Sequence, residues 1–346
     1  MNTRTTGIIG DLAVEADGLV KTFGSTRAVD GVSLAVPRGC VYGVLGPNGA
    51  GKTTMIRILA TLLRPDGGSA RVLGHDVVRE AAAVRRLISL TGQFASVDTD
   101  LTAEENLLLL GRLLGHSRRQ ARQRAGELLD AFGLAAAARQ QASRLSGGMR
   151  RKLDLAASII VAPDLLFHDE PTAGLDPRSR SALWETVRAI VADGTTVLLT
   201  TQYLDEADKL ADRIAVIDHG RVIAAGTRGE LKASTGSAGI RIRLLDPAKR
   251  DRARDLIASG QAITVHDEPD PAVIAARIPA KQRPAAAGEL AAHVLTRLTS
   301  AGIGVSDFAL GQPSLDEIFL ALTGGQAGTP DTEQPQPAPA GTEAVR

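Results

Sequence analysis

The feature that most constrains this chain is a glycine-rich run that fits the pattern G-x-x-x-x-G-K-[ST]. Glycine tolerates the positive φ values with which successive backbone N–H groups can surround a polyphosphate. In such a loop the lysine, here Lys52, reaches the outer phosphates, and the hydroxyl of Thr53 ligates Mg²⁺. The alternative is a chance glycine-rich turn. The candidate phosphate-binding residues are Gly46, Pro47, Asn48, Gly49, Ala50, Gly51, Lys52, Thr53 and Thr54.

The segments on either side of this loop favour the phosphate-binding interpretation. The apolar run 40–45 is typical of a buried strand. After the loop, Met55, Ile58, Leu59 and Leu62 recur at helical spacing, and Pro65 predicts the end of that helix. Strand, loop and helix therefore follow one another in the order that places a phosphate at a helix N-terminus.

Composition limits the class of protein. A length of 346 residues favours two domains, and 44% apolar with 23% charged residues is ordinary for a soluble globular chain. The net charge of +1 gives no indication of a nucleic-acid surface, so we expect no nucleic-acid partner. The single cysteine, Cys40, excludes an intramolecular disulfide and suits a reducing compartment. We expect neither a signal peptide nor a membrane span, because no apolar stretch is long enough.

The sequence divides into four zones, and it shows no internal repeat. Residues 1–12 are expected to be a flexible leader, and residues 13–233 alternate short strands with amphipathic helices, as in a largely parallel sheet. A flexible joint is expected at 233–239. A small α+β domain then covers 240–325, and the proline-containing tail 326–346 is predicted to be disordered.

The small domain opens and closes on recognisable elements. Its first segment, Ile240–Leu244, alternates apolar and basic residues as a half-buried strand does. Its last segment is predicted to be a helix, because Ser314 and Glu317 form a capping box and apolar residues recur on one face. Gly324 marks the end of that helix.

A second part of the nucleotide site is predicted at the end of another apolar run, 165–170. An acid at the end of a strand beside the phosphate loop can hold the Mg²⁺ hydration shell, and we assign that role to Asp169. Glu170 then stands where it can polarise the attacking water as a general base. Alone, such a run could be an ordinary strand end. His168 is interpreted as a packed, hydrogen-bonded histidine and not as a ligand.

A third element opens a helix and carries an unusual charge pattern. Ser146 can cap this helix, yet Arg150, Arg151 and Lys152 occupy its first turn, where the helix dipole disfavours cations. Either an anion binds at this terminus or the bases pair with nearby acids such as Asp154. From the charges alone, pairing is the simpler explanation. The element consists of Leu145, Ser146, Gly147, Gly148 and Met149.

With these three elements together, the chain resembles the ATP-binding subunits of ABC transporters over residues 13–233. The resemblance implies a P-loop NTPase cassette of the α/β class, with a mainly parallel sheet, an antiparallel β subdomain and a helical insert at about 94–163. It implies ATP as the nucleotide and Mg²⁺ as the metal. The loop 46–54 matches the Walker A motif, Asp169 and Glu170 match Walker B and the catalytic glutamate, and 145–149 matches the signature that binds the partner chain's ATP.

Three further positions match family motifs. Gln93 matches the glutamine loop, which contacts the metal and connects it with the membrane partner. Phe23 falls where the family stacks an aromatic ring on adenine, although it could instead be a packing anchor. Asp176 matches the D-loop, although an aspartate before Pro177 is also an ordinary helix N-cap.

Two positions depart from the family pattern. The signature ends in Met149 where glutamine is usual, a change of small effect because the serine and the backbone amides contact the phosphate. Gln202 replaces the switch histidine: it can donate a hydrogen bond to the γ-phosphate, but it cannot titrate. The resemblance implies the family's catalytic switch role for Gln202.

More narrowly, the chain is similar to the daunorubicin-resistance type of drug-exporter ATPase. The segments 198–208, 146–151 and 313–319 match that type and extend the resemblance to residue 325. Gln202 is then a trait of the subgroup. The resemblance implies export of hydrophobic compounds such as antibiotics through a separately encoded permease, with this chain peripheral at the cytoplasmic face of the membrane.

One cassette per chain predicts a homodimer. A phosphate loop and a signature helix of one chain cannot easily face the same nucleotide, so two chains are expected to meet head to tail around two ATP molecules. Two alternatives remain open. One is a soluble ABC ATPase acting on ribosomes or nucleic acid, although such proteins usually carry tandem cassettes or a long coiled coil. The other, a GTPase or metabolite kinase, leaves the signature unexplained.

Overall fold

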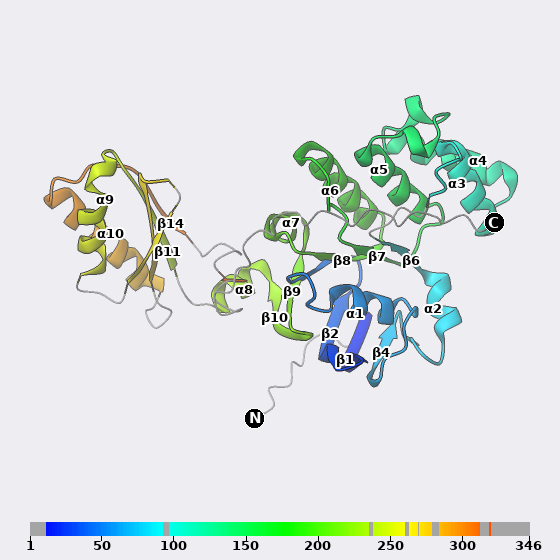
Figure 1. The fold of residues 1–346 in the computed structure, drawn as a ribbon, viewed down its shortest axis with the longest axis horizontal. Coiled ribbons are helices and arrows are strands. Elements are labelled where there is room, and N and C mark those ends of the chain that lie inside the picture. Colours follow the sequence, from blue (N-terminus) through cyan, green and yellow to red (C-terminus); the bar gives the residue numbers. More distant parts are fainter. Residues whose placement is uncertain are drawn as a thin grey trace, which may run out of the picture.

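The computed structural model describes residues 12–92, 97–234, 238–259, 263–268, 270–278, 284–311 and 318–319. Within these residues the strands form three sheets (Figure 1), of four, six and four strands. None of the described helices is long and apolar enough to cross a membrane.

The central sheet has the strand order β10-β9-β3-β8-β7-β6. Its strands from β9 to β6 run parallel, and only β10 pairs antiparallel at the edge. Every residue of β3 and β7 is buried, as expected for parallel strands covered on both faces. The bounds are β3 (Val41–Leu45), β6 (Ile88–Thr91), β7 (Leu165–Asp169), β8 (Thr196–Thr201), β9 (Arg213–Asp218) and β10 (Arg221–Thr227).

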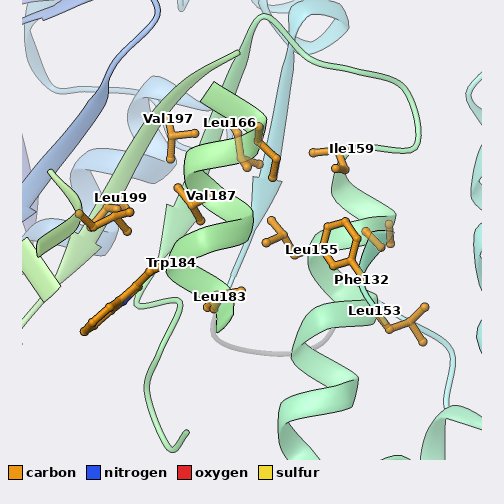
Figure 2. Close-up of a cluster of buried hydrophobic side chains, with 14 of the residues drawn as sticks. Phe132, Leu153, Leu155, Ile159, Leu166, Leu183, Trp184, Val187, Val197 and Leu199 are labelled. Carbon is orange, nitrogen blue, oxygen red and sulfur yellow. The ribbon is translucent and has the colours of Figure 1, made fainter. Parts of the chain in front are cut away.

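The two faces of this sheet belong to two different hydrophobic cores. Alternation along β8 shows this: Leu198 joins one cluster of buried side chains, and Val197 and Leu199 join the other. Figure 2 shows part of the second cluster, in which side chains of α5 and α6 gather with those of β7 and β8. The helices α6 (Pro177–Ala192) and α7 (Leu204–Leu210) contribute to it together with α5 (Gly147–Ser158).

An antiparallel sheet, ordered β2-β1-β4-β5, packs with α1 against the first face. Its first strand begins at Leu12, so the segment predicted as a flexible leader is one residue too long at that end. Residues 1–11 lie outside the described residues. The bounds are β1 (Leu12–Phe23), β2 (Thr26–Pro37), β4 (Gly67–Val72), β5 (His75–Asp76) and α1 (Lys52–Leu59).

The helix α1 ends earlier than its apolar spacing predicts. Met55, Ile58 and Leu59 are buried, but Leu62 is 61% exposed and lies outside the helix. Thr61 adopts a left-handed backbone with a φ of 63°, and its N–H donates to Ile58 O at 3.0 Å. This tight turn breaks the helical repeat, so the prediction for Leu62 is wrong.

Helices fill the chain between β6 and β7. Thr102 and Ser117 each cap a helix with a capping box, which fixes where α3 and α4 begin. The signature helix α5 packs against α3, α4 and β6. The bounds here are α3 (Ala103–Leu113) and α4 (Arg118–Ala131), and α2 (Ala81–Leu87) precedes β6.

A third sheet, ordered β12-β13-β11-β14, follows α8 in the chain (Figure 1). This sheet has its own hydrophobic core. The predicted strand at Ile240–Leu244 is confirmed within β11, where Ile240, Ile242 and Leu244 are buried. The predicted joint at 233–239 is too long, because α8 and β11 take up its ends. The bounds are α8 (Arg228–Ser234), β11 (Ala238–Leu244), α9 (Arg250–Ala258), β12 (Thr264–Asp267), β13 (Val273–Ile278), α10 (Pro284–Ser300) and β14 (Val305–Gly311).

The last described residues do not belong to the core of this third sheet. Ile318 is 1% exposed and lies in the same hydrophobic cluster as Leu210 and Leu231 of the larger unit, with Phe319 packed beside it. Both residues are helical. The proposed capping box of Ser314 and Glu317 and the tail from 320 lie outside the described residues.

Candidate functional site

The loop between β3 and α1 has the backbone that phosphate binding requires. Gly49 and Gly51 have φ values of 80° and 99°, in the region that side chains avoid. Two of the loop's glycines also have no room for a side chain. A Cβ on Gly46 would collide with the main-chain oxygen of Ile217, and a Cβ on Gly51 would collide with the main-chain oxygen of Ala28. These glycines therefore let the loop lie directly against neighbouring main chain. The candidate residues 46–54 are brought together here.

Lys52 begins α1 and points back across its own loop. Its Nζ donates to Gly46 O at 2.8 Å and Pro47 O at 3.0 Å, and lies 3.3 Å from Glu170 Oε1. The side chain is buried, and burial lowers its pKa below the ordinary value while the Glu170 carboxylate partly offsets that effect. Two main-chain carbonyl groups and the Glu170 carboxylate thus hold the ammonium group beside the loop.

Asp169 lies at the end of β7, where two hydroxyl groups donate to it. Thr200 Oγ1 donates to Asp169 Oδ1 at 2.5 Å, and Thr53 Oγ1 donates to the same oxygen at 3.2 Å. The phosphate loop and the acidic strand end predicted from separate parts of the sequence therefore meet. Their hydroxyl and carboxylate oxygens are the hard ligands that Mg²⁺ prefers. Among the described residues, no group of three or more His, Cys, Asp or Glu side chains is arranged to hold a metal ion.

Glu170 follows directly and has a strained backbone. Its φ is 48°, which is costly for a residue with a side chain and is often found at functional sites. The backbone N–H of Glu170 lies 3.1 Å from Thr200 Oγ1 and 3.2 Å from Thr200 O. With Lys52 and the loop, Glu170 lines a cavity of about 360 Å³. Among the described residues, Ala28 is the only other residue that lines the cavity. The volume of the cavity suits a polyphosphate.

His168 differs from the expectation. It is fully buried, as predicted, but neither ring nitrogen has a hydrogen-bond partner among the described residues. Burial, and secondarily the charge of Arg151, lowers its pKa well below the ordinary value of 6.5. The imidazole is therefore neutral at physiological pH, and the predicted hydrogen bond of this histidine is wrong.

The signature lies at the start of α5, outside the lining of the cavity. Ser146 caps the helix as predicted, accepting a hydrogen bond from Met149 N at 3.2 Å. Ser146 and Gly147 are exposed, Leu145 is buried, and residues 145–149 do not line the cavity. Gly148 lies so close to α6 that a Cβ would come 2.6 Å from Ser179 Oγ. The signature is thus open to another molecule.

The basic first turn of α5 is explained partly by pairing. Arg151 lies 3.3 Å from Asp154 Oδ2, which confirms the acid named from sequence. Arg150 instead donates to the main-chain oxygens of Ala142 and Ser143 at 3.1 Å each. Each arginine therefore has a partner within the protein.

Besides Gly46, Pro47, Asp169 and the signature, three further sequence candidates do not line the cavity. Phe23 is 50% exposed at the tip of β1, with Lys21 Nζ 5.7 Å from its ring centre. Asp176 caps α6, accepting from Arg178 N and Ser179 N, so the N-cap interpretation is confirmed and leaves the D-loop role open. Gln202 is half-buried between β8 and α7. Gln93 lies outside the described residues.

Sequence reasoning missed Thr200, which joins Asp169 and Glu170. The signal that could have found Thr200 is a polar residue near the end of a second apolar strand, because Asp169 of β7 lies opposite Thr200 of β8 in the parallel register. Polar residues that end neighbouring parallel strands meet at the same sheet edge, where ligands bind. A search for such pairs would have found it.

Comparison with known proteins agrees with this geometry. The family described as ABC transporter matches residues 29–173. The chain is 58% identical to the daunorubicin/doxorubicin resistance ATP-binding protein DrrA of Streptomyces peucetius, over 96% of this chain and 98% of that one. It is 47% identical to the doxorubicin resistance ATP-binding protein DrrA of Mycobacterium tuberculosis strain H37Rv (90% and 94% covered). It is 43% identical to the Nod factor export ATP-binding protein I of Paraburkholderia xenovorans (71% and 82%).

Solved structures show the same fold. An ATP-binding subunit of an ABC transporter aligns with a TM-score of 0.59 and 28% identity, covering 65% of this chain and 93% of that one. An ATP-binding cassette in its ADP conformation aligns with a TM-score of 0.58 and 27% identity, covering 63% and 92%. The chain therefore belongs to the ATP-binding subunits of the ABC transporter family, which hydrolyse ATP, and specifically to those related to the daunorubicin resistance ATP-binding proteins.

Proposed function

We propose that this ATPase powers the export of hydrophobic compounds, of the daunorubicin and doxorubicin class, through a separately encoded permease. The support is the relatives named for resistance to these drugs, which match nearly the whole chain at 47–58% identity. The more distant relative named for Nod factor export covers 71% of this chain. Because the described helices include no membrane span, we place the chain peripherally at the cytoplasmic face, bound to that permease.

We propose that the cavity at the phosphate loop carries out hydrolysis. The backbone N–H groups of the loop 46–54, which Pro47 alone lacks, bind the phosphates together with the Lys52 ammonium, and Phe23 stacks on the adenine. Glu170 orients and polarises the attacking water, and Gln202 donates a hydrogen bond to the γ-phosphate. Mg²⁺ would be held by Thr53, Asp169 and Gln93, and it would supply charge neutralisation when bound.

We propose further that two chains close head to tail around two ATP molecules. The exposed signature does not line its own chain's cavity, so it is free to complete the site of a second chain. A related cassette at 25% identity has been solved as a dimer after hydrolysis with ADP and phosphate bound. Asp176 then lies in the segment that follows the catalytic strand toward the partner.

Two contacts carry this proposal: Lys52 with Glu170, and Thr53 with Asp169. Lys52, Thr53 and Glu170 line the cavity, and Asp169 accepts the hydrogen bond of Thr53. A Glu170→Gln variant removes the base but keeps the side-chain shape, so it should bind ATP–Mg²⁺, stop hydrolysis and sediment as a dimer. Adding Ser146→Arg should return it to a monomer that still binds nucleotide. A dimer that persists with Ser146→Arg would contradict the head-to-tail arrangement.

The membrane partner is tested separately. Tagged Glu170→Gln protein, trapped with ATP–Mg²⁺ in its native host, should co-purify with a stoichiometric polytopic membrane protein after gentle solubilisation. Recovery with ribosomes or DNA and no membrane protein would overturn the exporter and leave the ATPase. Daunorubicin efflux from cells producing both proteins, lost with Glu170→Gln, then tests the substrate class.

A further inference from the structure

Arg151 joins the signature helix to the catalytic part of the same chain. It lies in α5 two residues after Met149, and its side chain is 12% exposed. Its Nη1 donates to Gly92 O at 2.7 Å, and its Nε donates to Pro171 O at 2.9 Å. Gly92 directly precedes Gln93, and Pro171 directly follows Glu170. One guanidinium group therefore contacts the main chain beside both positions.

Further contacts surround the strained residue itself. Arg151 Nη2 lies 3.5 Å from both Asp169 O and Glu170 O, so the side chain faces three successive carbonyl groups. Glu170 has its left-handed φ in the middle of this segment. A strained backbone persists when its surroundings over-determine it, and Arg151 is one of those surroundings. A shift of the start of α5 would therefore move the main chain that aims the Glu170 carboxylate.

The neighbouring arginine shows that this link is specific. Within the part of the chain that the structure describes, the Arg150 side chain donates hydrogen bonds only to the main-chain oxygens of Ala142, Ser143 and Leu145, all in the segment that leads into α5. Asp154, 1% exposed and one turn along the helix from Arg151, pairs with it and orients its fork. A guanidinium can bond two separate carbonyl groups at once in a fixed plane, which a lysine ammonium cannot reproduce.

We infer that Arg151 is a positioning residue that couples the two ATP sites. This inference rests on the proposed head-to-tail dimer, in which the signature of each chain binds its partner's ATP while Glu170 acts on the chain's own. Binding of the partner's γ-phosphate to residues 146–148 fixes the start of α5. Because Arg151 bonds the main chain at Gly92 and beside Glu170, fixing the start of α5 also fixes the backbone at these two residues. Each site is thus made competent by occupation of the other.

The test compares matched substitutions of two arginines. Arg151→Lys keeps the charge beside Asp154 but cannot span Gly92 O and Pro171 O. The control, Arg124→Lys, alters an arginine whose Nη2 also donates to a main-chain oxygen, that of Ile159 at the far end of α5. A second variant, Arg151→Met with Asp154→Asn, removes the link without leaving a buried carboxylate unpaired.

Hydrolysis is measured against ATP concentration, and single-site binding is measured with the fluorescent analogue MANT-ATP. For Arg151→Lys and the double variant, kcat should fall roughly 3- to 30-fold, and the Hill coefficient should fall toward 1. The Kd for MANT-ATP should stay unchanged, which shows that the phosphate loop is intact. The Arg124→Lys control should retain the wild-type kcat and Hill coefficient.

The outcomes separate this inference from the proposed function. Wild-type kcat and Hill coefficient in both Arg151 variants would overturn the coupling role, as would a Kd that weakens in proportion to kcat. An equal loss in Arg124→Lys would also overturn it, because any contact of α5 would then suffice. Failure of the dimer itself appears earlier, as Glu170→Gln protein that stays monomeric with ATP–Mg²⁺.

Discussion

Replacing Thr200 by valine should slow ATP hydrolysis while leaving nucleotide binding intact. The hydroxyl of this fully buried residue donates to Asp169 Oδ1 at 2.5 Å, and the N–H of Glu170 donates to it at 3.1 Å. Valine has nearly the same shape but can make neither bond. Both acidic residues therefore lose a partner while the surrounding strands keep their packing.

The size of the effect follows from the contacts that remain. Asp169 Oδ1 keeps Thr53 Oγ1 at 3.2 Å, and the Glu170 N–H keeps Thr200 O at 3.2 Å. The main loss is thus one hydrogen bond to a charged group, worth about 1.5–3 kcal/mol. We expect the free energy of unfolding to fall by about 2 kcal/mol. If the same amount is lost from the transition state, kcat falls about 30-fold.

A serine at the same position separates the effect of losing the hydroxyl group from the effect of changing the side-chain volume. Thr200→Ser keeps both bonds and deletes a buried methyl group, which costs about 1 kcal/mol of stability. Stability is measured by urea unfolding, followed by the fluorescence of the single tryptophan, Trp184. Activity is kcat at saturating ATP, and binding is the MANT-ATP Kd. Equal kcat values for the valine and serine variants would refute the reasoning, whatever their stabilities.

Three further outcomes are expected. Burial raises the pKa of Glu206 above its ordinary 4.5, so its contribution to stability is full below pH 4.5 and is lost as pH rises through the raised pKa. Urea unfolding of Glu206→Gln should accordingly show a smaller stability loss between pH 4.5 and pH 8 than wild type; an equal loss would contradict this. A methyl group on Gly46 collides with Ile217 O, so Gly46→Ala should abolish MANT-ATP binding, whereas Gly126→Ala, in open space on α4, should not. Burial raises the pKa of Cys40 from 9.0 to about 11, so iodoacetamide should modify it about 100-fold more slowly at pH 8 than in urea.

Local sequence signals predicted several of the elements around the phosphate loop and the signature. The strand before the loop, the buried face of α1 up to Leu59 and the cap by Ser146 all depend on residues near one another in the chain. The predicted extension to Leu62 failed because one left-handed residue, Thr61, breaks the repeat. Periodicity does not contain that information, since threonine rarely adopts this backbone.

Contacts between distant segments were harder to predict. The positioning of Asp169 and Glu170 by Thr200 depends on which strands are neighbours, and the bridge made by Arg151 depends on how α5 packs against the sheet. For His168, a polar residue in an apolar strand suggested a hydrogen bond, but its neighbours offer none to either ring nitrogen. Each of these features is fixed by tertiary packing and not by spacing.

The burial of Ile318 shows that the domain of the third sheet is attached to the cassette at a second point. The chain leaves the cassette after α8, forms a domain with its own core, and comes back to bury Ile318 among cassette residues. That domain is therefore an insertion tethered at both ends, and not an appendage at one end. Truncation at residue 240 removes cassette core as well as the domain. Its role is properly tested by excising 240–311 and closing the gap with a linker, so that Ile318 and Phe319 remain.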